Sequence, residues 1–394
     1  MPDGSNFARY PQPAERNSAA ARLALHPDEA AALPPTARDG RGATCNPQNR
    51  FEATTRHAFD DGWSTLAETF AELPPLPTTL TPERSRSAMA WNDSPDIGFD
   101  RSLNPYKGCE HGCVYCYARP SHAYLGLSPG LDFETRLFYK PDMPALLEKE
   151  LSRPAYVPRP VALGANTDPY QPVERTVALT RRLLEVLERF AHPVTIVTKS
   201  AGVLRDTDIL ARMARLNLVQ VCLSITTLDP RLARIMEPRA AAPGRRLAAL
   251  RALTDAGIPA GVLAAPMIPG LNDVEMERIL EAAQQHGAIH AGYVALRLPL
   301  EIAPMFESWL HHHMPDRAGK ILALVRDMRA GALYDSRFGT RQTGTGAYAD
   351  LMARRFALAM KRLGLDRAGR GAKGGEIRLD CSHFRVPGAQ LALF

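Results

Sequence analysis

The sequence lacks an apolar run long enough to cross a membrane. Its most apolar stretches, such as residues 258–268, are interrupted by proline and glycine. They fall short of the ~20 residues that a transmembrane helix needs. Residues 1–22 mix charged residues, proline and alanine, and they contain no apolar core of a secretory signal. We therefore expect a cytoplasmic protein that does not associate with a membrane.

Cysteine is also scarce, with six residues in a chain of 394. A reducing cytoplasm keeps thiols free, so these residues are not expected to form a disulfide framework. Cys45, Cys222 and Cys381 are far apart in the sequence, whereas the other three lie within eight residues of one another. Clustered thiols in a reducing compartment indicate a metal site.

Acidic residues are few in one late segment of the chain. Residues 317–385 contain 15 Lys and Arg against 6 Asp and Glu, although the whole chain has a net charge of only +6. Such a segment suits a polyanionic partner such as a nucleic acid. An ordinary solvated helical surface is the alternative. Aromatic residues are few here, so the sequence does not support the reading of bases by stacking.

Strand and helix patterns alternate through the middle of the chain. We expect strands at residues 161–164, 194–198, 219–225, 258–266 and 292–297, and helices at 173–190, 205–216, 244–256 and 273–286. Alternation at this spacing indicates β/α units around a parallel sheet. With one more strand near the clustered cysteines, the pattern predicts an α/β fold containing a partial (β/α)6-type barrel.

The regions on either side of this array have a different composition. Residues 1–75 are rich in proline, alanine and arginine without periodicity, and we expect them to be mostly disordered. The core is expected over residues 76–300, followed by a helical, basic C-terminal extension over 301–394. Within the extension we expect helices at 303–312, 317–330 and 347–363, a short strand at 376–380 and an apolar tail.

The clustered cysteines form a C-x3-C-x2-C motif, and they are Cys109, Cys113 and Cys116. Three thiolates at this spacing can bind one iron–sulfur cluster from a single loop, and Gly108 and Gly112 allow the backbone to wrap tightly. Because a [4Fe–4S] cluster has four irons, one iron keeps an open position, as in catalytic metal sites. A zinc site with His111 as the fourth ligand is the alternative, but it does not account for the β/α array.

This motif, with Tyr115 directly before the third cysteine and β/α units after it, resembles the radical S-adenosylmethionine (SAM) superfamily. The resemblance implies a [4Fe–4S] cluster that reduces SAM to methionine and a 5′-deoxyadenosyl radical, which abstracts hydrogen from the substrate. It also implies a reductant such as flavodoxin or ferredoxin.

Further motifs across about residues 90–300 resemble the spore photoproduct lyase-related branch, often labelled "DNA repair photolyase". Within it, the chain resembles an uncharacterised bacterial subgroup. The motifs of the branch are Tyr-Cys-Tyr at 115–117, Thr-Lys-Ser at 198–200, Ser-Ile-Thr-Thr at 224–227, Glu-Pro at 237–238 and Pro-Met-Ile-Pro-Gly-Leu-Asn-Asp at 266–273. The motifs of the subgroup are Asn-Pro-Tyr-x-Gly-Cys-x-His-Gly-Cys at 104–113 and Asp-Pro-Tyr-Gln-Pro at 168–172.

The resemblance implies cofactor-binding roles beyond the cluster ligands. Tyr115 matches an aromatic residue near the SAM adenine, with plain loop packing as the alternative. Lys199 matches a lysine that faces the SAM carboxylate, and Ser224 could bind the methionine or ribose part. Asp168 is the candidate for the SAM amino group, with helix capping as its alternative role and Glu174 as an alternative candidate.

Two residues are candidates for direct participation in the reaction. Tyr117 matches a tyrosine of the lyase that is proposed to relay hydrogen, and a buried core tyrosine is the alternative. The lyase also uses a further cysteine as a hydrogen donor, and the matching region around residues 158–166 has none. This departure affects thymine-dimer repair and not SAM cleavage. Cys222 shares a strand face with Ser224 and could replace the donor, or could be a small buried hydrophobe.

The chain ends in Gln390-Leu391-Ala392-Leu393-Phe394. This pentapeptide is similar to the Gln-Leu-(Ser/Asp)-Leu-Phe peptide by which bacterial replication and repair proteins bind the sliding clamp. Packing of the apolar tail onto the protein's own core is the alternative.

Taken with the basic segment, these features predict a radical SAM enzyme, a lyase or transferase, that acts on nucleic acid in DNA repair or modification. A radical SAM enzyme that modifies a protein or a small molecule is the alternative. A non-catalytic iron–sulfur protein is a third, which the presence of Lys199 and Ser224 argues against.

Overall fold

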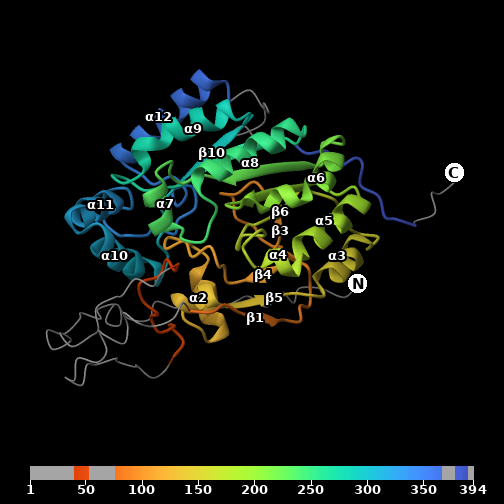
Figure 1. Ribbon diagram of the computed structural model, residues 1–394, viewed down its shortest axis with the longest axis horizontal. Helices are drawn as coiled ribbons and strands as arrows, with labels where there is room; N and C mark the ends of the chain where they lie inside the picture. The colour runs from red at the N-terminus through yellow and green to blue at the C-terminus, as the bar shows by residue number, and fades with distance from the viewer. Residues whose placement is uncertain (1–39, 53–75, 366–377, 389–394) are drawn as a thin grey trace, which may run out of the picture. The chain divides into compact units, whose positions relative to one another are not determined.

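The computed structural model of the chain describes residues 40–52, 76–365 and 378–388 (Figure 1). Most of the N-terminal region expected to be disordered lies outside these residues. So do the basic stretch at 366–377 and the apolar terminal peptide at 390–394.

A seven-stranded sheet forms the centre of the fold, in the order β10-β9-β8-β7-β6-β3-β2. Its strands are β2 (Met89–Trp91), β3 (Arg101–Leu103), β6 (Val161–Leu163), β7 (Val194–Thr198), β8 (Val219–Ser224), β9 (Ala260–Met267) and β10 (Ala291–Ala295). The six strands from β3 to β10 pair in parallel, and β2 joins the edge antiparallel to β3. The predicted α/β fold with a partial (β/α)6-type barrel is therefore confirmed, and β3 is the additional strand expected near the cysteines.

Helices connect the parallel strands and cover one face of the sheet. They are α3 (Met143–Leu151), α4 (Glu174–Val177), α5 (Leu179–Arg189), α6 (Thr207–Ala214), α7 (Pro230–Met236), α8 (Pro243–Asp255) and α9 (Met276–Gln285), with 3-10 turns η3 (Ala201–Asp206) and η4 (Asp273–Glu275). On β8, Val219, Val221 and Leu223 belong to the apolar core. Because side chains alternate along a strand, Cys222 and Ser224 face the opposite side of the sheet.

The helix predicted at residues 173–190 is divided into α4 and α5 at Ala178, which has a φ of 49°. The Glu174 side chain explains the break. Its carboxylate accepts hydrogen bonds from the backbone N–H groups of Leu179 and Thr180, at 3.1 Å each, and so caps the first turn of α5. Both carboxylate oxygens of Glu174 accept hydrogen bonds from the backbone. This favours a structural role for Glu174 over binding of the SAM amino group.

A second, three-stranded sheet was not predicted. Its strands are β1 (Thr79–Pro82), β5 (Arg136–Tyr139) and β4 (Tyr106–Lys107), in the order β1-β5-β4, and it is accompanied by η2 (Arg119–Leu125) and α2 (Leu131–Thr135). Strands of two to four residues leave too short a pattern for periodicity to reveal. This sheet positions the cysteine loop, because β4 ends two residues before Cys109.

The C-terminal extension contains α10 (Ile302–His313), α11 (Pro315–Asp327) and α12 (Ala347–Leu363), close to the predicted helices. Helix α10 packs on α11, and α12 packs on α9, beside which it lies in Figure 1. Residues 378–380 form no strand, contrary to the expectation for that part of 376–380. None of the described helices has the length and apolar character needed to span a bilayer.

Candidate active site

The three clustered cysteines lie in one loop between β4 and η2. Cys109 and Cys113 are buried, and Cys116 is half-buried. Gly108 and Gly112 have φ values of 78° and 69°, the left-handed region that favours glycine. A Cβ atom on Gly108 would lie 2.5 Å from the Leu137 side chain, so the tight wrapping expected of this loop requires glycine.

Residues 40–52 pack against the cysteine loop, although they fall in the region predicted to be mostly disordered. The backbone N–H groups of Gly42 and Ala43 donate to the Glu134 carboxylate at 3.0 and 2.8 Å. A Cβ atom on Gly42 would lie 1.7 Å from the carbonyl oxygen of Gly112, so the two backbones are in direct contact. The fully buried pair of Glu134 and Arg119 completes the support, since Arg119 also donates to the Cys113 carbonyl at 2.9 Å.

The Asp-Pro-Tyr-Gln-Pro motif holds the opposite side of the loop. Gln171 is fully buried, and its Oε1 accepts from the Glu110 N–H at 2.9 Å. Its Nε2 donates to the Gly108 carbonyl at 3.1 Å. The amide thus pairs with the backbone on both sides of Cys109, much as a neighbouring strand would. The motif is visible in the sequence, but the role of Gln171 is not, because its partners at Gly108 and Glu110 are distant along the chain.

We predict that Gln171→Leu lowers the iron content of protein reconstituted without oxygen and speeds loss of the cluster to a chelator. The change leaves the buried Gly108 carbonyl and Glu110 N–H without partners, which costs about 1–3 kcal/mol of loop stability. Gln220→Leu is the matched control, because Gln220 is also a buried amide but bonds to His290 beside the far end of β8. Equal iron content and chelation rates in the two variants would show that Gln171 does not position the cysteines.

Four polar side chains meet where β7 and β8 end. The Lys199 Nζ donates to the Ser224 Oγ at 2.6 Å and to the Thr226 Oγ1 at 3.2 Å. It also lies 3.2 Å from the Glu237 Oε1. The structure therefore brings together Lys199 and Ser224, as predicted from their positions at strand ends. Parallel strands place their carboxyl ends at one edge, which is where α/β enzymes bind ligands.

Glu237 organises this group of side chains. It is 2% exposed, forms an ion pair with the buried Arg246, and accepts from the hydroxyl of Tyr115. Burial alone would raise the pKa of the Glu237 carboxyl, but the positive charges of Arg246 and Lys199 hold it below its usual range. The site thus holds two cations against one carboxylate. The Glu-Pro motif was the sequence signal for Glu237, and its role required the structure.

Tyr115 and Tyr117 flank Cys116 but differ in their surroundings. Tyr115 is buried, and the Lys199 Nζ lies 5.6 Å from its ring centroid. Burial, together with the nearby Cys113 and Glu237, raises the pKa of the Tyr115 hydroxyl. Tyr117 is 46% exposed, so it is not a core tyrosine, and its hydroxyl donates to the Ala165 carbonyl.

Asp168 lies beside the cysteine loop, where its carboxylate is occupied by protein donors. Oδ1 accepts from the Thr198 hydroxyl at 2.7 Å and from the Tyr170 N–H at 2.9 Å. Oδ2 accepts from the Lys199 N–H at 2.7 Å and lies 3.3 Å from the His111 Nδ1. Asp168 therefore ties the cluster loop to the end of β7 and fixes the backbone of Lys199. These contacts favour a positioning role over direct binding of the SAM amino group.

Cys222 lies on the same face of β8 as Ser224, one alternation farther from the strand end. Its Sγ is 3.1 Å from the Nε2 of His290, which also contacts Gln220. Burial lowers the pKa of His290 to about 4, so its ring is neutral at pH 7. The structure thus surrounds Cys222 with polar side chains and leaves it half-buried.

The three loop cysteines lie close together, as the ligands of one cluster must, because Cys116 packs against the apolar groups that contain Cys113 and Cys109. Within the described residues, no three His, Cys, Asp or Glu side chains are arranged to hold one ion, and His111 faces Asp168. In a [4Fe–4S] cluster each thiolate binds a different iron, so the sulfurs need not converge on one point. Burial raises the pKa of Cys109, and the nearby charges of Asp168, Cys113 and Cys116 raise it further. A buried thiol with a raised pKa ionises readily only beside a cation, and the iron ions of a cluster would supply that positive charge.

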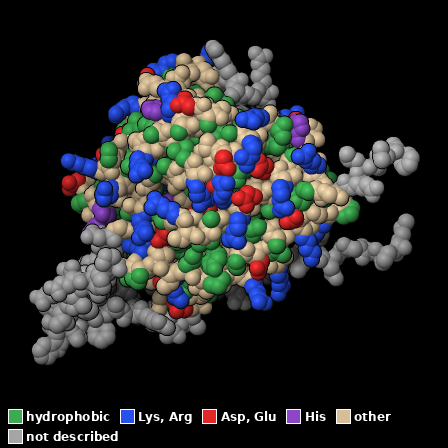
Figure 2. Space-filling model, turned by 45° about the vertical axis from the view of Figure 1, so that its right-hand side comes forward, with side chains coloured by type: hydrophobic (Ala, Val, Ile, Leu, Met, Phe, Trp, Pro, Cys, Tyr) green, Lys and Arg blue, Asp and Glu red, His purple; other side chains and the backbone are tan. Residues whose placement is uncertain are grey.

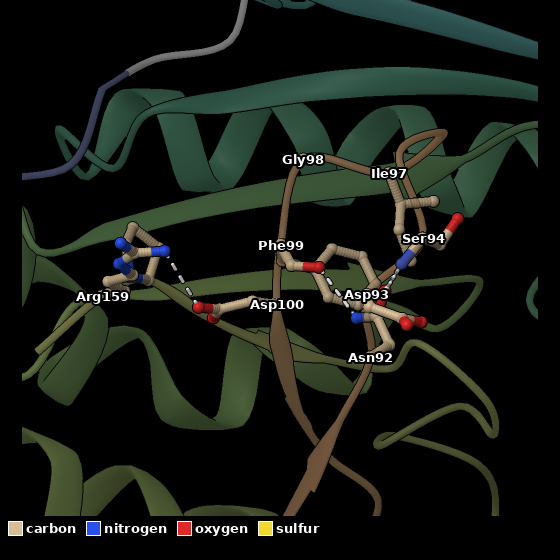
Figure 3. A pocket seen from close by; sticks show the side chains of 9 residues that line it. Asn92, Asp93, Ser94, Ile97, Gly98, Phe99, Asp100 and Arg159 are labelled. Carbon is tan, nitrogen blue, oxygen red and sulfur yellow. Dashed lines mark hydrogen bonds and ion pairs between the residues drawn. The ribbon is translucent and has the colours of Figure 1, made fainter. Parts of the chain in front are cut away.

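A hollow of about 380 Å³ lies elsewhere, at the loop that joins β2 and β3 (Figure 3). Several of its polar side chains bond to one another or to the nearby backbone. Arg159 donates to the Asp100 carboxylate at 3.2 Å, and Asn92 donates to the Phe99 carbonyl at 2.8 Å. None of the candidate site residues lines it, so it is separate from the candidate active site.

Comparisons with known proteins agree with this geometry. The family model for the radical SAM superfamily matches residues 103–283. Rv2578c of Mycobacterium tuberculosis is 35% identical over 232 residues, which cover 58% of this chain and 68% of that protein. MJ0683 of Methanocaldococcus jannaschii is 29% identical over 173 residues, 44% of this chain and 62% of the relative. The chain belongs to the radical SAM superfamily, and it is an enzyme of that type.

Among solved structures, the fold is similar to that of spore photoproduct lyase. One variant of that lyase aligns with a TM-score of 0.50 and 18% identity, over 73% of this chain and 79% of the other. A second variant aligns with the same TM-score and 19% identity, over 74% of this chain and 80% of the other. The predicted resemblance to the lyase-related branch is therefore confirmed at the level of the fold.

Proposed function

We propose that this radical SAM enzyme uses a [4Fe–4S] cluster and SAM to act on a nucleic acid, in DNA repair or modification. Cys109, Cys113 and Cys116 would hold the cluster. When bound, the cluster and SAM supply a 5′-deoxyadenosyl radical that abstracts hydrogen from the substrate. A flavodoxin or ferredoxin would provide the electron.

The polar group at the ends of β7 and β8 would bind SAM. Lys199 and Arg246 carry two positive charges against the single negative charge of Glu237, so the group has an unbalanced positive charge. That surplus suits the SAM carboxylate, which Lys199, the more exposed of the two cations, would bind directly by giving up one of its present hydrogen bonds to the Ser224 and Thr226 hydroxyls. Ser224 would add a hydrogen bond, and Tyr115 would pack near the adenine.

The observation that carries the nucleic-acid proposal is the charge on α12. Arg354, Lys361 and Arg362 are exposed, and no ion pair within the described ranges neutralises them. Arg355, by contrast, is paired with Glu277 at 2.6 Å. On the face drawn in Figure 2, Lys and Arg side chains are spread over the whole surface, with Asp and Glu beside some of them. Unpaired cations attract phosphate backbones. The resemblance to the "DNA repair photolyase" branch and the clamp-like peptide at Gln390–Phe394 support the same class of substrate.

We predict that binding of a single-stranded oligonucleotide falls steeply with salt and depends on these three cations. The triple variant Arg354→Gln, Lys361→Gln and Arg362→Gln should reduce the slope of log affinity against log salt by about 2, since each lost phosphate contact contributes about 0.7. Fluorescence anisotropy at several salt concentrations measures this slope.

An equal charge change elsewhere provides the control. Arg181, Arg189 and Arg212 lie on α5 and α6 and are each paired with a carboxylate. Their triple replacement by Gln should leave the slope close to that of the wild type. If the wild type binds without salt dependence, or if the two triple variants behave alike, α12 is an ordinary solvated surface and the nucleic-acid proposal loses its main support.

A further inference from the structure

Arg297 follows the carboxyl end of β10 and lies over the exposed ring of Tyr117. Its guanidinium carbon is 5.2 Å from the ring centroid. The hydroxyl of Tyr117 bonds to Ala165, which follows the end of β6. Tyr117 therefore contacts residues after β6 and after β10, two strands that are not neighbours in the sheet. The two side chains therefore lie at the same edge as Lys199 and Ser224, but beside a different strand.

Arg297 is held in place without a carboxylate partner among the described residues. Its Nε atom is buried and has no hydrogen-bond partner there. Arg329, which is 2% exposed, donates to the carbonyl oxygen of Leu296 at 2.6 Å and so fixes the backbone next to Arg297. Across residues 40–52, 76–365 and 378–388, neither arginine forms an ion pair.

The two guanidinium groups also repel each other. Burial lowers the pKa of Arg329, and the positive charge of Arg297 lowers it further, while the negative charge of Asp335 near Arg329 opposes both effects without reversing them. Bringing two like charges together in a partly buried place costs free energy unless an anion neutralises them. A guanidinium that meets an aromatic face through its flat side keeps the N–H groups along its edge available to an acceptor.

We infer that Arg297 and Tyr117 form the site that recognises a phosphate-bearing aromatic group of the substrate, with the phosphate on Arg297 and the base against the exposed ring of Tyr117. Arginine binds phosphate through two parallel N–H groups, and exposed tyrosine rings stack on bases without regard to sequence. SAM bound at Ser224 and Lys199 would then lie two to three strands away from Arg297, on the same side of the array as the recognised nucleotide. This inference rests on the proposed function and names the part of the site that binds the nucleic acid.

The test compares binding of an oligonucleotide with a charged phosphodiester backbone and of one with an uncharged backbone. The probes are a fluorescent single-stranded oligothymidylate and the same oligomer with methylphosphonate linkages. Arg297→Gln should weaken binding of the phosphodiester oligomer on the order of tenfold, the loss of one charge-assisted hydrogen-bonded contact. It should leave the methylphosphonate oligomer almost unaffected. Arg297→Lys should restore part of the affinity, since lysine keeps the charge but not the paired geometry. Arg326→Gln, an exposed site on α11, controls for net charge.

Each outcome decides between defined alternatives, and far-UV circular dichroism reports whether the variants remain folded. If the wild type binds neither oligomer at low salt, the proposed function fails together with the inference. If it binds the oligomers but Arg297→Gln matches Arg326→Gln, the inference alone is overturned. If Arg297→Gln lowers SAM affinity and spares oligomer binding, Arg297 belongs to the SAM site, which also overturns it.

Discussion

Replacing any one of Cys109, Cys113 and Cys116 by alanine is expected to abolish reductive SAM cleavage in protein reconstituted without oxygen. Each thiol would bind a separate iron, so the loss of one leaves the cluster with two protein ligands. No other cysteine within the described residues lies in this loop to substitute for it. The measurement is the amount of 5′-deoxyadenosine formed after addition of a chemical reductant, together with the iron content of each variant.

Cys381→Ala is the control for this experiment. Cys381 is a half-buried thiol far from the loop in sequence, and its replacement should leave both iron content and SAM cleavage at the wild-type value. Far-UV circular dichroism separates loss of the cluster from loss of the fold. Normal SAM cleavage by a folded Cys113→Ala protein would refute the assignment of these thiols as cluster ligands.

The second large effect is expected at Glu237, where Glu237→Gln should reduce the free energy of unfolding by about 3–5 kcal/mol. The change leaves the buried Arg246 guanidinium, 1% exposed, without its carboxylate. It also removes the charge that faces Lys199. Breaking one partner of a buried ion pair is costly because the remaining charge cannot be hydrated. Denaturant unfolding at pH 7 measures the difference.

The ionisation of Glu237 makes the difference in free energy of unfolding between wild type and Glu237→Gln depend on pH. The folded pKa of Glu237 lies below the ordinary value of 4.5, so the ionised form stabilises the fold. The gap between wild type and Glu237→Gln should be complete above about pH 4.5. It should narrow as the pH falls toward the folded pKa, where the wild-type carboxylate takes up a proton. A gap that stays constant from pH 7 down to pH 3.5 would contradict an ionised Glu237.

An exposed ion pair provides the matched control for Glu237. Glu188 is paired with Arg212 between two surface helices, with side chains 28% and 50% exposed. Glu188→Gln removes the same charge by the same chemical change. Because water screens this pair, the loss should stay within about 1 kcal/mol. Equal losses at Glu188 and Glu237 would mean that burial does not strengthen the contribution of Glu237.

The central β/α array could be predicted from the sequence because its signals are local. Strands at β6 to β10 and helices such as α8 and α12 each produce a repeating apolar pattern within a dozen residues. The C-x3-C-x2-C spacing is equally local, and it identified Cys109, Cys113 and Cys116 without knowledge of the fold. Lys199 and Ser224 could be placed at the same sheet edge because parallel strands end together.

The contacts that complete the site could not be predicted, because they join residues that are distant in the sequence. Gln171 reaches the backbone on both sides of Cys109, and the segment at residues 40–52 reaches Glu134. The short strands of the β1-β5-β4 sheet were missed for a related reason, since too few residues repeat to form a pattern.

The sequence by itself thus determined the class of chemistry and the central sheet, since both depend on neighbours along the chain. Only the tertiary structure decided which charges are neutralised and which are not. It paired Glu237 with Arg246 and Lys199, occupied Asp168 with protein donors, and left Arg297 over Tyr117 without a carboxylate among the described residues. The physical reason is that the energy of a charge depends on burial and on the distance to other charges, and both are set by the folded chain.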